Sequence, residues 1–128
     1  MNSEGFIKSI KKVIHDDVVS GLIGYLENPT GRKPPKSLVH LSEYISNLSQ
    51  NEKSTLQKII AHATHSKIFG LLAVLDGVRA IENSSGKGEL KLYWEKGEER
   101  ILLNDPEGED LHDLYQSEVY SEIFNDET

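Results

Sequence analysis

The stretch ELKLYWEKGEERILL, residues 89–103, decides the fold class of this 128-residue chain. Within it Leu90, Leu92 and Trp94 alternate with charged residues and a tyrosine, and Lys96-Gly97 then interrupts the alternation. A period of two that is broken by a two-residue turn predicts a β-hairpin. We therefore expect one antiparallel hairpin between about residues 89 and 103.

The register of this hairpin follows from keeping its apolar residues on one face. Pairing Glu95 with Glu98 across the turn meets that condition. This register sets three pairs opposite one another: Leu92 with Ile101, Leu90 with Leu103, and Tyr93 with Arg100. The two glutamates beside the turn repel each other, which weakens the register.

Upstream of the turn-rich segment 83–88, apolar residues recur at three- and four-residue steps, as in amphipathic helices. One helix is expected over residues 3–27, with an apolar stripe of Phe6, Ile10, Val13, Ile14, Val18, Leu22 and Tyr25. A second helix is expected to begin at a Ser37 cap and to end at residue 48. A third begins at Ser49, because Ser49 and Glu52 have the spacing of a reciprocal capping box. The sequence does not decide whether residues 68–75 continue this third helix or form a fourth helix after a bend near Ser66.

The run from residue 68 to residue 75 is apolar on nearly all sides of a helix, so it predicts the centre of the core. The expected core residues are Ile68, Leu71, Leu72 and Leu75.

Downstream of the hairpin, a last apolar stripe predicts a C-terminal helix with an acidic outer face. The stripe comprises Leu111, Leu114, Tyr115, Val119 and Ile123. The whole chain, residues 1–128, therefore predicts a mostly helical α+β single domain of four to five helices, with residues 125–128 as a frayed tail.

The composition indicates the cellular compartment in which we expect the protein. The chain contains no cysteine, which excludes a disulfide framework and a thiolate zinc site. The N-terminus, with polar Asn2-Ser3-Glu4, lacks the features of a signal peptide. The longest apolar run is eight residues, far short of the ~20 that span a bilayer. We expect a cytoplasmic protein with no membrane contact.

Charge is divided unevenly along the chain. Residues 1–81 hold ten Lys/Arg and seven Asp/Glu, a net of +3, whereas residues 82–128 hold four and fourteen, a net of −10. Residues 105–128 contain nine carboxylates and no Lys or Arg. Such a region attracts basic surfaces and repels nucleic acid.

The basic loop at Arg32, Lys33 and Lys36 has no aromatic residue on which a base could stack. We therefore expect a basic protein partner and no nucleic acid. Part of the basic charge is expected to contact the acidic half internally.

The histidines are the candidates for metal chemistry. His62 and His65 are three residues apart in a predicted helix, with Asp76 or His15 as a third ligand that the spacing does not select. His112-Asp113 is a pair of the kind found in metal phosphohydrolases, but it lies where a phosphate would be repelled. We expect no metal, no cofactor and no catalytic residue. A metal-dependent hydrolase using His62, His65 or His112 is the alternative.

The acidic region also contains the aromatic residues Tyr93, Trp94, Tyr115 and Tyr120. Aromatic anchors among carboxylates suit a basic protein partner, because rings supply buried area and charges accelerate encounter. The expected partner-binding site takes its charge from Asp110, Asp113, Glu118 and Glu122, and its anchor from Trp94 or Tyr115. A surface that serves only solubility is the competing interpretation.

In size, charge and its acidic-aromatic region, the chain resembles the small acidic immunity proteins that bacteria make against nuclease toxins. The resemblance implies a compact, non-catalytic protein that covers a basic active site with carboxylates and aromatic rings. We therefore expect a non-enzymatic protein-binding module, an immunity protein or antitoxin. A small adaptor or regulatory subunit of an accessory or phage gene cluster is the alternative. The sequence specifies neither the partner nor the oligomeric state.

Overall fold

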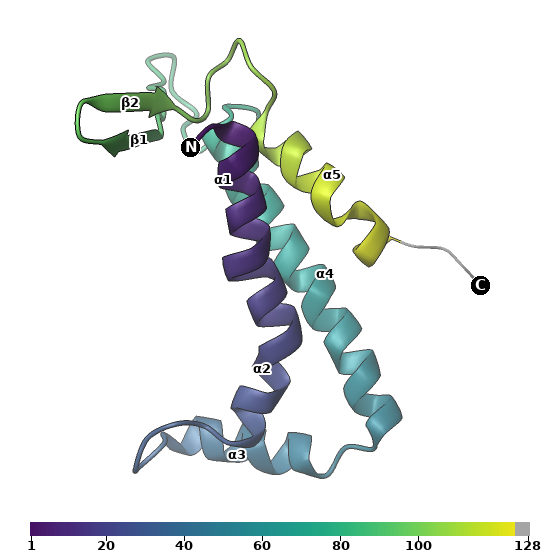
Figure 1. The fold of residues 1–128 in the computed structure, drawn as a ribbon. Helices are drawn as coiled ribbons and strands as arrows, with labels where there is room; N and C mark the ends of the chain where they lie inside the picture. Colours follow the sequence, from purple (N-terminus) through teal and green to yellow (C-terminus); the bar gives the residue numbers. More distant parts are fainter. Residues whose placement is uncertain (125–128) are drawn as a thin grey trace.

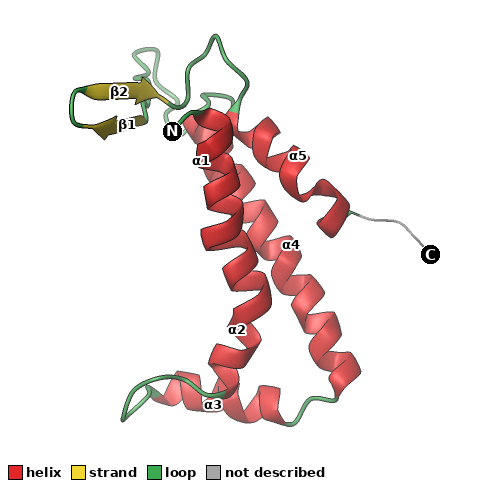
Figure 2. Ribbon diagram, viewed as in Figure 1, coloured by secondary structure: helices red, strands yellow, loops and turns green. Residues whose placement is uncertain are grey.

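The computed structural model describes residues 1–124, so the tail expected at residues 125–128 lies outside the described residues. One continuous helical rod comprises α1 (Ser3–Ile10), the π-helical segment η1 (Lys11–Asp16) and α2 (Asp17–Glu27). The other helices of this part are α3 (Lys36–Ser46), α4 (Gln50–Leu75) and α5 (Leu111–Ile123). Strands β1 (Tyr93–Lys96) and β2 (Glu99–Leu102) form an antiparallel hairpin (Figures 1 and 2). The expected mostly helical α+β fold with one hairpin is confirmed.

The π-helical segment η1 decides which face of the first rod is buried. A π turn adds about one residue to a helical turn. Ile7 and His15 are eight residues apart, and the π turn takes up one of those residues. Their side chains therefore point in the same direction to within about 20°, like those of residues seven apart in a regular α-helix. Both are 1% exposed, whereas Val13 and Ile14 are 67% and 43% exposed. The expected apolar stripe is therefore wrong at Val13 and Ile14, because the π turn rotates them away from the core. It is also wrong at Tyr25, which is 44% exposed on α2, away from the core.

The local sequence pattern predicted the start of α4 correctly but not the start of α3. The capping box is confirmed: Ser49 Oγ accepts the Glu52 N–H at 3.1 Å, and Glu52 Oε1 accepts the Ser49 N–H at 2.9 Å. The Ser37 cap is wrong, because α3 begins one residue earlier and the Pro35 carbonyl accepts its first backbone bonds. Helix α4 continues without a break through Ser66.

The hairpin is two residues out of the expected register. Its pairs are Tyr93 with Leu102, Trp94 with Ile101, Glu95 with Arg100, and Lys96 with Glu99. Gly97 has a φ of +60° and is followed by Glu98, so glycine occupies the first turn position. A type II′ turn needs positive φ there, and the expected Lys96-Gly97 turn would have placed lysine at that position. A shift of two residues leaves the faces unchanged, so the apolar residues still share one side.

The hydrophobic core lies at one end of the molecule, between α1, the C-terminal part of α4, and α5. Its buried residues are Ile7, Leu72, Leu111, Tyr115 and Val119. Of the expected core, Leu72 is buried, and Ile68 and Leu75 pack against the core while partly buried. Leu71 is 62% exposed, so its placement was wrong. The core covers only the side of α4 that carries Ile68, Leu72 and Leu75, and Leu71 lies outside it.

Asn104 joins the hairpin to the helices. Its Nδ2 donates to the carbonyl oxygens of Leu75 at 2.6 Å and Leu90 at 2.8 Å, while its Oδ1 accepts the Leu92 N–H at 2.8 Å. The side chain is 9% exposed, so these bonds satisfy a buried amide. The end of α4 and the start of the hairpin are thereby fixed beside each other.

Candidate functional site

The acidic region forms one end of the structure, around the start of α5 and along it (Figure 1). We call its seven carboxylates within residues 1–124 the acidic end, and they are Asp105, Glu107, Glu109, Asp110, Asp113, Glu118 and Glu122. The first three lie in the loop before α5, and Asp110 is the N-cap residue of that helix. Asp126 and Glu127 lie outside the described residues.

Helix α5 supports this surface because its inner face is completely buried. Leu111, Tyr115 and Val119 recur every four residues and are each 0% exposed. Asp113, Ser117 and Tyr120 lie on the opposite side and are exposed. The acidic side chains of the helix are therefore carried by a segment that is anchored in the core.

Asp76 caps the N-terminus of α5. It lies at the end of α4, and its side chain is only 2% exposed. Its Oδ2 accepts the backbone N–H of His112 at 2.8 Å and lies 2.6 Å from His112 Nδ1. Asp110, at the N-cap position itself, makes no side-chain capping bond. A carboxylate supplied by another helix thus satisfies a free N–H of α5 and favours its dipole.

Few positive charges balance the acidic end. Glu122 binds Lys11 at 2.9 Å, and Asp113 lies 3.5 Å from His112 Nε2. Among the described residues, this lysine bond is the only Lys or Arg ion pair between residues 1–81 and the acidic half. The expected internal contact between the two halves is therefore limited to one pair. The other five members of the acidic end have no ion pair within residues 1–124.

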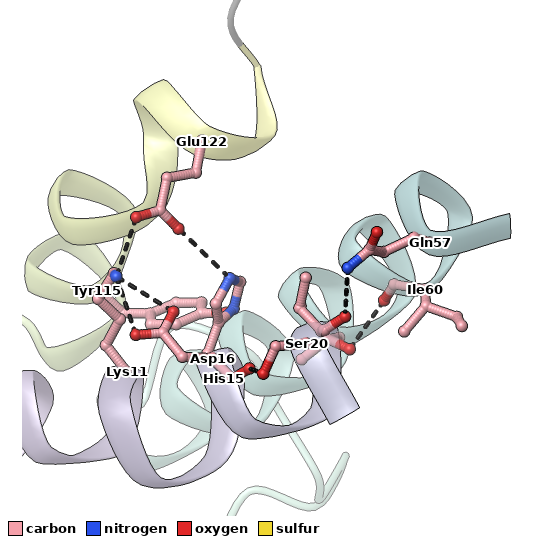
Figure 3. Close-up of polar contacts among 10 residues, drawn as sticks. Lys11, His15, Asp16, Ser20, Gln57, Ile60, Tyr115 and Glu122 are labelled. Carbon is pink, nitrogen blue, oxygen red and sulfur yellow. Dashed lines mark hydrogen bonds and ion pairs between the residues drawn. The ribbon is translucent and has the colours of Figure 1, made fainter. Parts of the chain in front are cut away.

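A polar cluster lies where η1 meets α5, and Figure 3 shows its side chains pointing toward one another. Lys11 Nζ lies 3.1 Å from both carboxylate oxygens of Asp16 and 2.9 Å from Glu122 Oε1. Residues five apart in an α-helix point about 140° away from each other, so the π turn makes the Lys11–Asp16 contact easier. His15 Nδ1 lies 2.7 Å from the Tyr115 hydroxyl, and His15 Nε2 lies 4.0 Å from Glu122 Oε2.

Burial governs the proton equilibria of this cluster. Removal from water lowers the pKa of His15 below its ordinary value, and the nearby carboxylates of Asp16 and Glu122 offset this only in part. Burial also raises the pKa of Tyr115 well above its usual range, so the phenol keeps its proton. The hydrogen bond to Glu122 raises the pKa of Lys11, which stays charged. Near neutral pH the cluster therefore combines a neutral histidine, a neutral tyrosine and an ammonium group.

Two groups of side chains in residues 1–124 have ligand atoms within 4.8 Å of one another, as a metal site requires: His15, Asp16 and Glu122, and Asp76, Asp110 and His112. In the first group, the Lys11 ammonium already contacts both carboxylates. In the second, Asp76 is engaged in capping α5 through His112. Each group thus has a structural role that needs no metal, and the absence of a metal requirement remains a prediction.

His65 and His112 have different hydrogen-bond partners, whereas His62 and His65 both pack against the ring of Phe124. His62 packs edge-on against Phe124, with ring centroids 5.6 Å apart. His65 Nε2 lies 2.6 Å from Gln116 Oε1, and its ring stacks on Tyr115. Asp76 contacts His112 rather than either of them. Neither metal-like group contains His62 or His65, so the structure does not assemble the expected His62–His65 ligand set.

The expected partner-binding residues are only partly brought together. Asp110, Asp113, Glu118 and Glu122 lie on or beside α5, whereas Trp94 is half-buried on a hairpin that projects on the other side of α1 (Figure 1). Tyr115 is fully buried, so its expected role as a surface anchor is wrong. Tyr120, an aromatic residue of the acidic region that was not expected to be the anchor, is 55% exposed on α5. The helical period was the available signal, since Tyr120 falls outside the apolar stripe that contains Tyr115.

Comparison of the chain with protein-family models, with curated proteins and with solved structures finds no match. Within residues 1–124, no helix has both the length and the apolar character required to cross a bilayer. The function is therefore inferred from the geometry of the acidic end and of the polar cluster behind it.

Proposed function

We propose that the protein is a non-enzymatic binding module whose acidic end docks onto a basic surface of another protein. One observation carries the proposal: Asp105, Glu107, Glu109, Asp110 and Glu118 have no ion-pair partner within residues 1–124. Like charges gathered on a fixed scaffold repel one another, and a basic partner relieves that repulsion. Negative potential of this kind also accelerates encounter with a positive surface.

The anchoring ring of this surface is Tyr120. It is exposed on α5 between Glu118 and Glu122, and its ring lies 5.2 Å from that of Phe124. Tyrosine is enriched among the residues that dominate binding energy, because its ring buries a large area and its hydroxyl can hydrogen-bond. A basic partner would thus meet charge along α5 and an aromatic contact near its C-terminal end.

Two classes of binding module fit this surface. The first is an immunity protein or antitoxin that covers the basic active site of a nuclease-like toxin. The second is a small adaptor or regulatory subunit. A metal-dependent hydrolase has weaker support, because neither group of possible metal ligands within residues 1–124 contains His62 or His65, and His112 contacts the capping carboxylate of Asp76. We favour the first class, since a basic nucleic-acid-binding site is the natural complement of an acidic surface.

Capture of a partner tests the proposal. The tagged protein is produced together with the products of its neighbouring genes, and the proteins that co-purify are identified. The proposal expects a basic protein that the Asp110→Lys/Asp113→Lys variant no longer captures. Glu98→Lys/Glu99→Lys is the matched control, because it makes the same change in net charge at two exposed residues, one in the turn of the hairpin and one at the start of β2. Capture of no basic protein, or equal capture by both variants, would reject the proposal.

A further inference from the structure

The half of the molecule remote from the core is barely buried. Among residues 17–64, which we call the open half, Ile45 is the only buried residue. This stretch contains α2, α3 and most of α4. Its exposed large apolar side chains are Tyr25, Val39, Leu41, Tyr44 and Ile59. Three helices with so few buried residues cannot be held in place by an interior of their own.

The accessible surface area supports the same conclusion. The chain exposes 9340 Å². A compact monomer of 14.4 kDa exposes about 6,800 Å², so the excess is about 2,500 Å². Four residues of fully extended chain account for at most about 700 Å² of it, and the rest belongs to residues 1–124. A standard interface buries only about 800 Å² per partner, and obligate homodimers bury more.

The open half also contains a shallow apolar groove between the end of α3 and the start of α4. Its volume is about 350 Å³, and its lining includes Tyr44, Leu48, Leu56 and Ile59. Tyr44 and Ile59 are 64% and 60% exposed. An aromatic ring and an aliphatic side chain therefore stand at the edge of a groove that can receive side chains from another helix.

We propose that the open half is a homodimer interface, in which α3 and the N-terminal part of α4 pack against the same elements of a second copy. A second copy is the occupant because the excess area has the size of the large, apolar interfaces of obligate homodimers. A two-fold interface also uses one patch twice, so a single exposed apolar region on each chain is sufficient.

Charge sets the orientation of the two copies. The acidic end and the basic loop at Arg32, Lys33 and Lys36 lie at opposite ends of the molecule (Figure 1). A parallel arrangement would bring two acidic ends together, and the repulsion would oppose association. An antiparallel arrangement through the open half keeps the two acidic ends apart. The inference goes beyond the proposed function, and it leaves α5 free for another protein.

Molar mass by sedimentation equilibrium or light scattering tests this inference. The unmodified protein is expected to have twice its single-chain mass of 14.4 kDa. Ile59→Lys and Tyr44→Lys are each expected to return it to the single-chain mass with the helical circular dichroism retained, since both side chains are mostly exposed within one copy. Ile81→Lys is the matched control, because Ile81 is also exposed but lies outside the open half, and this variant is expected to remain dimeric.

Fluorescence transfer between single cysteines tests the orientation, because the chain contains no cysteine of its own. Labels at Lys33→Cys on one copy and Glu109→Cys on the other should transfer energy more strongly than two copies labelled at Glu109→Cys. A single-chain mass up to millimolar concentration would overturn the dimer, even if the protein then bound a different partner. Equal behaviour of Ile59→Lys and Ile81→Lys would overturn its placement. Stronger transfer between the two acidic ends would overturn the antiparallel arrangement.

Discussion

The hydroxyl of Tyr115 lies 2.7 Å from Nδ1 of His15, a hydrogen bond between side chains 100 residues apart in the chain. Both side chains are almost completely buried. The bond joins the π-helical segment η1 to the inner face of α5, the helix that carries Asp113, Glu118 and Glu122 of the acidic end. The position of the acidic surface therefore depends on a polar contact within the core.

Removal of this hydroxyl should weaken the fold. In Tyr115→Phe the ring remains, but His15 Nδ1 loses its partner in a buried site. An unsatisfied buried polar group costs about 1–3 kcal/mol, and urea denaturation should report a loss of that size. Tyr120→Phe is the control, since Tyr120 is exposed, and its free energy of unfolding should match that of the parent. Equal stability of the two variants would show that the buried bond contributes nothing.

The same histidine should make stability depend on pH. Burial lowers the pKa of His15 in the folded state, so the unfolded state binds a proton more readily. Stability is then fully present above the unfolded pKa of about 6.5 and is lost as pH falls through the folded pKa. We expect the melting temperature to fall between about pH 7 and about pH 5.5, and His15→Gln should reduce this dependence. In His62→Gln, where the exposed histidine changes, the dependence should persist. A dependence unchanged in His15→Gln would contradict the assignment.

Two adjacent leucines test the position of the core. Leu72 is 3% exposed and Leu71 is 62% exposed. Leu72→Ala should cost about 2–5 kcal/mol, because it leaves a cavity in the core. Leu71→Ala should change the free energy of unfolding by less than about 0.5 kcal/mol. Thermal and urea denaturation of the two variants side by side provide the comparison, and similar losses would contradict the placement.

Most of the fold could be predicted because its signals are local. The two-residue period at Leu90, Leu92 and Trp94 indicated the hairpin, and the Ser49–Glu52 spacing located the start of α4. The hairpin register could not be fixed, since a shift of two residues keeps every side chain on its face. The conformation of Gly97 and the Glu95–Arg100 ion pair separate the two registers.

The candidate site was predicted less well, because it depends on non-local contacts. The acidic residues of α5 were identified from composition alone, and the exposure of Asp113 follows from the helical period. Tyr115 belongs to the apolar stripe of that helix, so its burial could have been inferred from the same pattern. The π turn could not, since no local residue pattern distinguishes it from an α-helix. Hence the meeting of Lys11, His15 and Glu122 was not foreseen.

Asp76 should be important for the start of α5. Its carboxylate accepts the backbone N–H of His112, and its side chain is almost completely buried. Asp76→Ala removes this cap and should cost about 1–3 kcal/mol, measured by urea denaturation. Asp105→Ala is the control, because Asp105 is exposed in the preceding loop and only accepts the N–H of Glu107. If both variants lost the same free energy, the capping role of Asp76 would be refuted.

Binding kinetics separate the role of charge from that of the aromatic ring. Once a basic partner is identified, the association rate constant should fall as salt rises to physiological strength, because screening shortens the range of the electrostatic field to about 8 Å. Asp110→Lys/Asp113→Lys should lower the association rate in the same way. Tyr120→Ala should instead speed dissociation by about tenfold, since a buried ring contributes after contact is made. Ser117→Ala, on the same exposed side of α5, should leave both rates unchanged. Association that ignored salt and the reversed charges would leave the acidic end with a role in solubility alone.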